Sequence, residues 1–367
     1  MGRVICTQCG QPYPEQGVPY RCIRCGGIYD FDAPPLLDWG TLRNDLPGLW
    51  RFWMALALPP GAGVFWLGEG NTPLVPQSYR GHTVHLKLES LNPSGSYKDR
   101  GSAVLVSWLR ARGVTEAVED SSGNAGASFA AYAARAGLRA VVYVPESASG
   151  PKRLQIERYG ATLIRVPGPR SAAAQAVLEV VRQGAVYASH AYLPFGLPGI
   201  ATIAYEVWEQ LGQRMPGTVI APVGHGGLLL GLVRGFQALR QGGGIPQLPY
   251  FVGVQAAACA PVVAAFEQRG GRDIRDDVEE RPTLAEGVRV RQPVRMEALF
   301  KEIGPDQGTF LAVDEAEIER AFITLCHSGI YVEPTSALTW AALERLDAQL
   351  PEPIVLIMTG SGLKYAS

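Results

Sequence analysis

Long apolar runs and an excess of one charge are both missing from this sequence. No apolar stretch approaches the roughly 18 residues that a membrane-spanning helix needs, and 33 basic against 34 acidic residues leave a formal net charge of −1. The near-zero net charge gives no indication of the basic surface that binding to nucleic acid or to an anionic membrane requires. The first residues also lack the apolar core of a secretory signal peptide. We therefore expect a cytoplasmic protein that binds neither nucleic acid nor a membrane.

Nucleotide-binding signatures are also absent. The glycine-rich stretch at residues 224–228 is not followed by the Lys-Ser or Lys-Thr of a Walker A loop. It also lacks G-x-G-x-x-G spacing and the acidic residue of a dinucleotide site. These absences argue against a P-loop NTPase and against a hydride-transferring dehydrogenase.

Cysteine is scarce but concentrated, with four of the six cysteines in the first 25 residues. Two C-x-x-C pairs, "CTQC" and "CIRC", are each followed by glycine, a spacing that suits tetrahedral Zn²⁺. The alternatives are two disulfides or a redox dithiol; a cytoplasmic context argues against the first and paired knuckles against the second. Four cysteines close the coordination shell, so we predict a structural zinc ribbon over residues 1–30. Its ligands are Cys6, Cys9, Cys22 and Cys25.

Short apolar stretches alternate with Ala-rich helical stretches from residue 72 onward. The predicted strands are residues 83–89, 139–145, 161–168, 185–191, 218–224, 250–256 and 353–360. The predicted helices are residues 101–113, 123–137, 152–160, 171–184, 199–212, 227–241 and 337–350. Nearly continuous apolar strands between helices indicate mostly parallel sheets that are covered on both faces. The fold class is therefore α/β.

Three strand ends are followed by glycine and small polar residues, at 121–124, 224–228 and 359–361. Ligands bind at the carboxyl ends of strands in open α/β sheets. Backbone amides at a helix start suit a carboxylate at 121–124, and the glycines of 224–228 suit a phosphate. Thr359 and Ser361 offer neutral hydroxyls. Each stretch alone also has a structural explanation: a helix cap, close strand–helix packing or a turn.

The stretch "LNPSGSYKDRGS" at residues 91–102 places a single lysine, Lys98, on a turn of small and polar residues. A surface lysine ordinarily stands among other charges on a solvated helix face. An amine on a shaped turn, a phosphate cradle, a carboxylate site and a hydroxyl at a strand end are the parts that pyridoxal phosphate and an amino acid need. The aldehyde of this cofactor forms a Schiff base with an amine, and its phosphate and pyridine nitrogen require partners.

The lysine turn resembles the corresponding motif of the tryptophan-synthase-β-like (fold type II) pyridoxal-phosphate enzymes. The resemblance covers nearly all of the chain after the ribbon. The motifs "GEGNTPL" (68–74), "SSGN" (121–124), "EPTSAL" (333–338) and "TGSGLK" (359–364) look most like threonine synthase, whose members often carry an amino-terminal zinc ribbon. The resemblance implies a lyase that converts O-phosphohomoserine and water into threonine and phosphate. It also implies a homodimer and two three-layer α/β/α domains.

The resemblance further implies the domain boundaries and the role of each matching residue. Residues 31–70 form a connector, 71–110 and 205–367 a large cofactor-binding domain, and 111–204 a small domain. Lys98 is the catalytic Schiff-base lysine and proton shuttle. The implied cofactor-binding residues are Lys98, Asn124, Gly224, His225, Gly226, Gly227, Leu228 and Thr359. The implied substrate-binding residues are Ser96, Ser121, Ser122, Gly123 and Asn124.

Three departures from the family pattern lie on the substrate side. Gly196 aligns with the arginine expected for the substrate phosphate, His225 with a cofactor-loop asparagine, and Ala125 with a common threonine. Other side chains would then have to meet the phosphate. The candidates are His190 or His225, together with Lys87 or Arg100.

Two other functions remain open at this point. "SGNAG" and "GHGGLLLG" also resemble serine/threonine dehydratases, so β-elimination or β-replacement on a related amino acid is the alternative within the same chemistry. A non-catalytic cofactor-binding or regulatory protein is the alternative from another class. The intact Lys98 and Thr359 argue against that last alternative.

Overall fold

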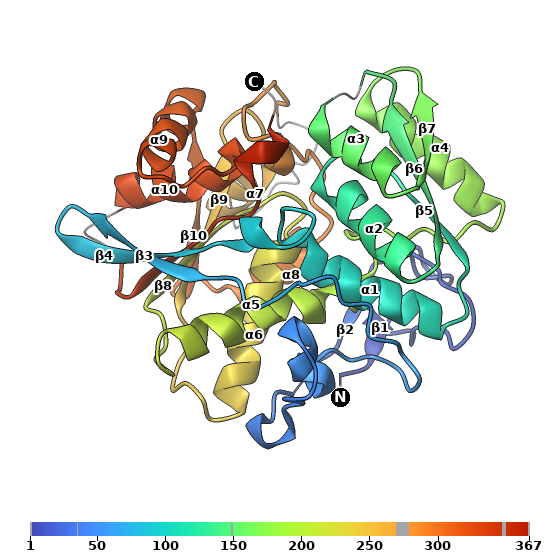
Figure 1. Cartoon of the computed structure of the whole chain (residues 1–367), viewed down its shortest axis with the longest axis horizontal. Coiled ribbons are helices and arrows are strands. Elements are labelled where there is room, and N and C mark those ends of the chain that lie inside the picture. The colour runs from blue at the N-terminus through green and yellow to red at the C-terminus, as the bar shows by residue number, and fades with distance from the viewer. Residues whose placement is uncertain (1, 35, 148–149, 269–278, 347–349, 366–367) are drawn as a thin grey trace. The chain divides into compact units, whose positions relative to one another are not determined.

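A computed structural model describes residues 2–34, 36–147, 150–268, 279–346 and 350–365. Contacts within the chain separate two compact units (Figure 1). Unit 1 comprises Met1–Gly70 and Asn92–Ile200, and unit 2 comprises Asn71–Leu91 and Ala201–Tyr365. The domain boundaries given above stay predictions.

The amino-terminal part of unit 1 is a small antiparallel pair followed by short helices. Strand β1 (Val4–Cys6) pairs with β2 (Tyr29–Phe31). Two 3-10 helices follow, Trp39–Thr41 and Gly48–Ala55. The second contributes fully buried apolar side chains, including Trp50, to the unit 1 core, so the predicted connector is packed structure.

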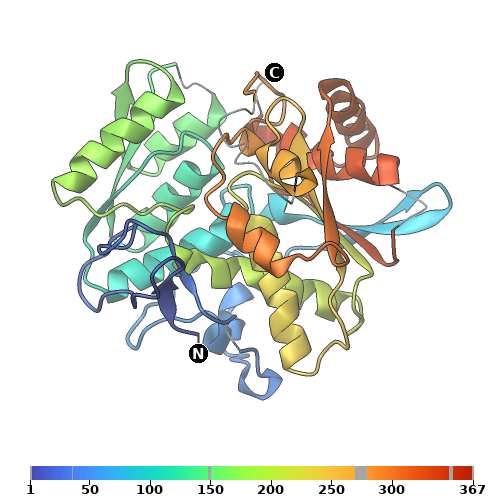
Figure 2. The ribbon, with the colours of Figure 1, turned by 180° about the vertical axis from the view of Figure 1, so that it is seen from behind.

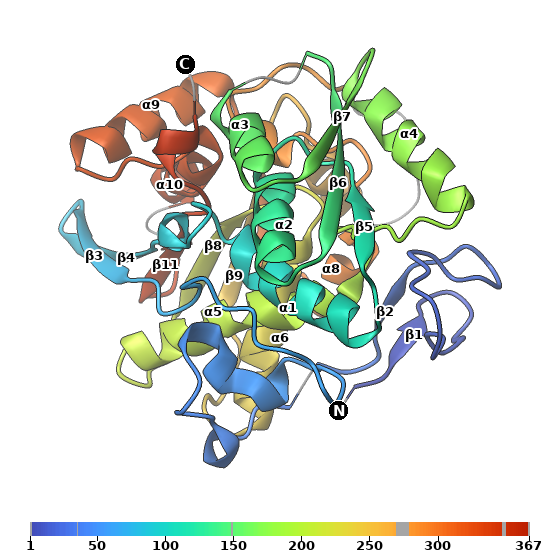
Figure 3. The ribbon, with the colours of Figure 1, turned by 45° about the vertical axis from the view of Figure 1, so that its right-hand side comes forward.

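The rest of unit 1 is a three-layer α/β/α sandwich. Within the described residues its sheet has the order β5-β6-β7, all parallel: β5 Glu116–Glu119, β6 Arg139–Pro145 and β7 Thr162–Val166. Figure 3 shows α2 and α3 on one side of these strands and α4 on the other. Helix α1 packs on α2. The bounds are α1 Lys98–Ala111, α2 Asn124–Arg135, α3 Pro151–Arg158 and α4 Arg170–Arg182.

Unit 2 is built on a larger sheet, which within the described residues has the order β10-β9-β8-β11-β4-β3. All neighbours are parallel except β3 and β4, which form an antiparallel hairpin at one edge. The bounds are β3 Leu74–Tyr79, β4 His82–Lys87, β8 Thr218–Pro222, β9 Tyr250–Ala256, β10 Gly308–Val313 and β11 Ile354–Ile357.

Alternate residues of β9 show that helices cover both faces of this sheet. Val252 and Val254 belong to the apolar cluster that contains Trp340 of α10. The intervening Phe251 points the other way, with its ring 6.1 Å from that of Phe236 in α6. Because side chains alternate across a strand, α10 and α6 cover opposite faces, and unit 2 is also three-layered. Figure 2 shows α6 beside α8.

The remaining helices complete the described structure. Their bounds are α5 Leu197–Gln210, α6 Gly227–Gln241, α7 Pro261–Glu267, α8 Met296–Glu302, α9 Glu315–His327 and α10 Pro334–Leu346. Further 3-10 helices are Glu89–Leu91, Pro194–Gly196, Glu286–Val288 and Gly362–Lys364. Among the described residues no helix has the length and apolar character to cross a membrane.

The α/β class with mostly parallel sheets is confirmed, while several elements differ from prediction. The strand predicted at 185–191 is reduced to a single bridge between Tyr187 and Val118. Strands β3, β5 and β10 were not predicted. β5 reads only "EAVE", too short and too charged for an apolar-run signal. The predicted helix 337–350 ends at Leu346, and positions 347–349 lie outside the described residues.

Candidate active site

Lys98 is the first residue of α1, on a turn that a buried carboxylate fixes. Asp99 is fully buried, and its two oxygens accept hydrogen bonds from the Ser94 amide at 2.6 Å and the Ser94 hydroxyl at 2.5 Å. Gly95 has a φ of 85°, a left-handed conformation that a side chain would strain. Lys98 itself is half-buried. The turn therefore holds the lysine backbone in one conformation.

Ser96 lies two residues before this lysine. Its side chain is fully buried, and within the described part of the chain its hydroxyl has no hydrogen-bond partner. A buried hydroxyl left in this way costs roughly 1–3 kcal/mol. A bound polar group near Lys98 would supply the missing hydrogen bond.

The loop at residues 121–124 joins β5 to α2 in the same unit. Helix α2 begins at Asn124, and Gly123 before it offers no capping side chain. The Ser121 hydroxyl accepts a hydrogen bond from the Gly123 amide at 3.3 Å. Gly126 permits the tight approach of this loop, because a Cβ there would lie 1.8 Å from the Ser121 carbonyl oxygen. The amides of the first turn are thus gathered at one place, as anion binding requires.

A carboxyl–imidazole pair lies at the end of β5, directly before this loop. Glu119 Oε1 is 2.9 Å from His190 Nδ1; the Glu119 side chain is 1% exposed and that of His190 is 25% exposed. Burial raises the pKa of Glu119 to about 8, against a smaller opposing effect of the Lys98 charge. Burial, together with the Lys98 charge, holds the pKa of His190 well below its usual value. At neutral pH the pair therefore carries its proton on the carboxyl group.

The glycine loop at residues 224–228 lies in unit 2, between β8 and α6. Gly226 has a φ of 93°, and a Cβ there would lie 2.9 Å from Leu299 Cδ1. A Cβ at Gly224 would lie 3.0 Å from the Gly287 carbonyl oxygen. The His225 carbonyl accepts a hydrogen bond from the Arg295 amide at 2.9 Å. The two glycines therefore let the loop pack closely against the neighbouring segments that contain Gly287 and Leu299, at the start of a helix that begins at Gly227.

Thr359 lies at the end of β11 and is 3% exposed. Its Oγ1 is 3.0 Å from the Ser336 hydroxyl, which also accepts a hydrogen bond from the Gly360 amide at 3.3 Å. Since β11 and β8 are parallel neighbours, their carboxyl ends lie at one edge of the sheet. Residues 224–228 and Thr359 therefore share that edge within unit 2.

Lys87 is not available for a substrate phosphate. It is fully buried, and its Nζ donates hydrogen bonds to the Thr72 carbonyl at 2.6 Å, Glu206 Oε2 at 2.8 Å and Gln210 Oε1 at 2.9 Å. Glu206 Oε1 also accepts from the Asn71 amide at 2.8 Å. These hydrogen bonds tie the "GNTP" segment to α5.

Gly196 packs where an arginine side chain would have little space. A Cβ at this position would lie 3.0 Å from the carbonyl oxygen of Gly101 in α1. A Cβ at Gly199 would lie 2.1 Å from the carbonyl oxygen of Arg100. The two glycines allow the segment before and within α5 to approach α1 closely, only a turn beyond Lys98.

The four amino-terminal cysteines converge. The sulfur atoms of Cys6, Cys9, Cys22 and Cys25 all lie within 4.8 Å of one another. The Cys6–Cys25 and Cys9–Cys22 Sγ distances are 3.5 and 3.6 Å, so neither pair is a disulfide. Zn–S bonds of about 2.3 Å in a tetrahedron place sulfurs about 3.8 Å apart. The cluster matches the geometry of a four-thiolate metal site.

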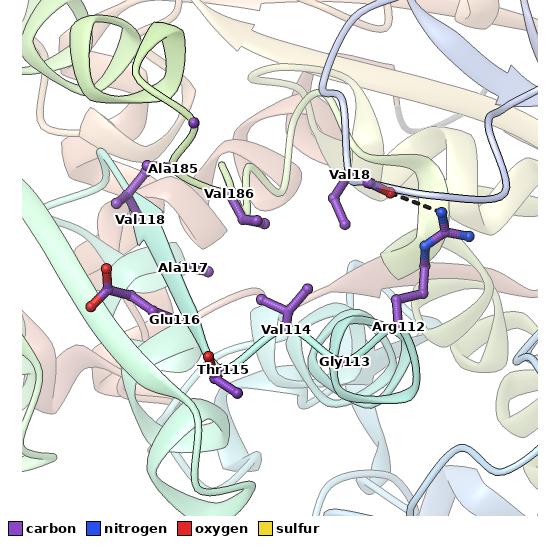
Figure 4. A pocket seen from close by; sticks show the side chains of 12 residues that line it. Val18, Arg112, Gly113, Val114, Thr115, Glu116, Ala117, Val118, Ala185 and Val186 are labelled. Carbon is purple, nitrogen blue, oxygen red and sulfur yellow. Dashed lines mark hydrogen bonds between the residues drawn. The ribbon is translucent and has the colours of Figure 1, made fainter.

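A pocket of about 370 Å³ lies elsewhere in unit 1 (Figure 4). It is bordered by Gly17 and Val18 of the cysteine-rich segment, by the turn after α1 and by Val186. Arg112 at its rim donates to the Pro14 and Gly17 carbonyls at 2.9 and 2.8 Å. None of the predicted cofactor residues lines it, so we do not assign the active site there.

Several residues that shape the site were not identified from sequence. Ser336 was not singled out within "EPTSAL", and Asp99 was considered only as part of the turn. Glu119 stands two residues before "SSGN" in "EDSSGN". Its place two residues before the glycine-containing loop was the signal that could have identified it.

Comparison with known proteins shows the family of the chain. Residues 65–360 match the family described as "Pyridoxal-phosphate dependent enzyme". The chain is 34% identical to a threonine synthase of Methanocaldococcus jannaschii, over 98% of this chain and 92% of that protein. It is 31% identical to a threonine synthase of Methanosarcina acetivorans, over 99% and 92%. Among solved structures, a threonine deaminase superimposes with a TM-score of 0.67 at 26% identity, covering 81% of this chain and 94% of that one.

Proposed function

The chain belongs to the pyridoxal-phosphate-dependent enzymes, and from this premise we propose that it is a threonine-synthase-like lyase that converts O-phosphohomoserine and water into threonine and phosphate. The observation that carries the proposal is 34% identity with a threonine synthase across 98% of the chain. The alternative is β-elimination or β-replacement on a related amino acid. The 26% identity to a threonine deaminase supports that alternative less strongly.

Each unit carries residues of the kinds that pyridoxal phosphate needs. Unit 1 offers the half-buried amine of Lys98 and, beside it, the buried Ser96 hydroxyl. Unit 2 offers the glycine loop at 224–228, before the start of α6, and the buried Thr359 hydroxyl. An amine, an amide cradle and a neutral hydroxyl match the aldehyde, phosphate and ring nitrogen of this group.

When bound, pyridoxal phosphate supplies an electron sink that stabilises negative charge on the carbons of an amino acid. In our proposal Lys98 attaches the cofactor through Nζ and later moves a proton between substrate carbons. The amides of residues 121–124 hold the substrate carboxylate, and the Asn124 side chain donates to the phenolic oxygen of the cofactor. The loop at 224–228 binds the cofactor phosphate. The Thr359 hydroxyl meets the ring nitrogen and, unlike a carboxylate, does not force it to stay protonated.

We further propose that the four cysteines bind one structural Zn²⁺. The convergence of four sulfur atoms on two glycine-terminated knuckles supports this assignment. Four protein ligands fill a tetrahedral shell and leave no open position for a substrate. The homodimer, the cytoplasmic location and the division into a ribbon, a connector and two domains remain predictions from the sequence.

The test is a substrate panel with the purified holoenzyme. O-Phosphohomoserine, threonine, serine and O-phosphoserine are supplied separately, and phosphate, threonine and keto acid are measured. The proposal expects phosphate and threonine in equal amounts from O-phosphohomoserine. Keto acid from threonine or serine, without turnover of O-phosphohomoserine, would replace the proposal by its alternative.

A further inference from the structure

The end of β5 carries two adjacent acids, each bonded to a side chain from the segment that follows α4. Glu119 meets His190 at 2.9 Å, and Asp120 Oδ1 accepts a hydrogen bond from the Tyr187 hydroxyl at 2.7 Å. Both acids directly precede residues 121–124. Neither the Glu119–His190 pair nor the Asp120–Tyr187 pair has a role in the proposed function.

Glu119 has one carboxyl oxygen in contact with His190 and one without a hydrogen-bond partner in the described part of the chain. The side chain is 1% exposed, and the oxygen without a partner is Oε2. An ionised carboxylate in such a place would lack the hydrogen bonds that its charge demands. A neutral carboxyl group, which donates one proton and leaves a carbonyl oxygen, is much less costly there.

We propose that Glu119 is a positioning residue of the active site, whose carboxyl proton is donated to Nδ1 of His190 and so fixes His190 as the tautomer with hydrogen on Nε2. A neutral imidazole carries one hydrogen. When Nδ1 accepts a hydrogen bond, that hydrogen must be on Nε2. If Glu119 were ionised, Nδ1 would be the donor, and Nε2 of a neutral ring would be an acceptor.

The charged and titratable groups around the pair favour this arrangement. Lys98 from α1 and Arg170 from the start of α4 both act electrostatically on His190 and oppose a positive charge on its ring. Asp120 acts in the opposite direction on His190. Burial disfavours the ionisation of Asp120, although the Tyr187 hydroxyl favours it. Burial and the charges of Lys98 and Arg170 disfavour a positive His190 ring more than Asp120 favours it. His190 therefore stays uncharged.

An uncharged N–H donor suits an anionic oxygen of the substrate. The His190 side chain keeps 25% of its surface exposed. Close packing of Gly196 on α1 leaves little space for an arginine at that position. We therefore assign His190 to the recognition of a phosphate oxygen. This part rests on the proposed function, whereas the tautomer does not.

Histidine tautomers can be read directly by long-range ¹H–¹⁵N correlation on protein labelled with ¹⁵N-histidine. The chain has five histidines, so His190→Gln identifies the signal of interest by its loss. For the wild-type protein without substrate at pH 7 we expect the Nε2–H tautomer of His190. An imidazolium signal or an Nδ1–H tautomer at pH 7 would overturn the proposal, and this measurement needs no variant at Glu119.

The Glu119→Gln variant tests whether Glu119 itself sets the tautomer of His190. In the wild type, the tautomer should change to Nδ1–H as the pH rises through about 8, where Glu119 ionises. The glutamine amide also donates to Nδ1 but does not titrate, so in the variant the Nε2–H tautomer should persist to higher pH. Asp120→Asn, the matched control, should retain the wild-type transition. A transition that survives Glu119→Gln would assign the titration to another group and contradict the proposal.

Recognition of the substrate has a separate readout. His190→Gln should raise KM for O-phosphohomoserine about tenfold, the effect of one charged hydrogen bond, with a smaller change in kcat. His327→Gln, at an exposed histidine in α9, should change neither. An unchanged KM in His190→Gln would refute the assignment to phosphate. Absence of any threonine formation would refute the proposed function and leave the tautomer result standing.

Discussion

The carbonyl oxygen of Ser121 occupies the space that a side chain at Gly126 would need, only 1.8 Å from the position of its Cβ. The contact folds the loop at 121–124 back onto the first turn of α2. This loop follows the end of β5, two residues after Glu119. A glycine inside a helix here determines the geometry of a loop two to five residues earlier.

Replacement Gly126→Ala should therefore displace this loop. The overlap is with backbone, so strain of roughly 1–3 kcal/mol is expected in the free energy of unfolding. Misplacement of the amides by about 1 Å should lower kcat/KM about 100-fold. Gly304→Ala is the control, because a Cβ at Gly304 meets nothing within 4 Å. Equal activities of the two variants would show that the loop does not hold substrate.

The buried pair of Lys87 and Glu206 should be a major determinant of stability. Lys87→Met leaves the Glu206 carboxylate buried without its cation, which typically costs about 3–5 kcal/mol. Denaturant unfolding measures this cost. Arg43→Met removes the exposed pair with Asp45 and should cost no more than about 1 kcal/mol. If Lys87→Met lowered the free energy of unfolding by no more than Arg43→Met does, the buried Lys87–Glu206 pair would not contribute to stability as described.

Zinc should be bound in a ratio of one per chain, measured by elemental analysis of the purified protein. Chelation, or Cys9→Ser, should remove the metal and lower the melting temperature, because the short strands β1 and β2 have a small core of their own. Cys326→Ser, outside the cluster, should keep both metal and stability. Full stability after complete loss of zinc would contradict a structural role.

The free energy of unfolding should depend on pH through Glu119. Its folded-state pKa of about 8 lies above the unfolded value of 4.5, so the unfolded chain loses this proton first. Stability contributed by the neutral carboxyl group is present below pH 4.5 and is lost between pH 4.5 and 8, by an amount on the order of 5 kcal/mol. Glu119→Gln does not titrate, so the difference in stability between the variant and the wild type should grow over this range. A constant difference would show that Glu119 is ionised throughout.

Sequence patterns predicted the apolar strands and the helices that follow them well, because a fully buried strand such as β8 reads as an unbroken apolar run. They did not predict β5, because its four residues include two glutamates and only their tertiary surroundings make Glu119 buried. The lysine turn and the glycine loops were evident, since chemistry restricts their residue types. The role of Lys87 in a buried ion pair was not evident from the sequence, because its partner Glu206 is 119 positions away.

The most direct test of the central claim is turnover of O-phosphohomoserine in H₂¹⁸O, with mass spectrometry of both products. Elimination of phosphate breaks the bond between the substrate carbon and the phosphate oxygen, and the added water then supplies the hydroxyl of threonine. One ¹⁸O should therefore appear in threonine and none in phosphate. The Lys98→Ala variant should form neither product. Homoserine together with ¹⁸O-labelled phosphate would instead reveal hydrolysis at phosphorus and contradict the proposed reaction.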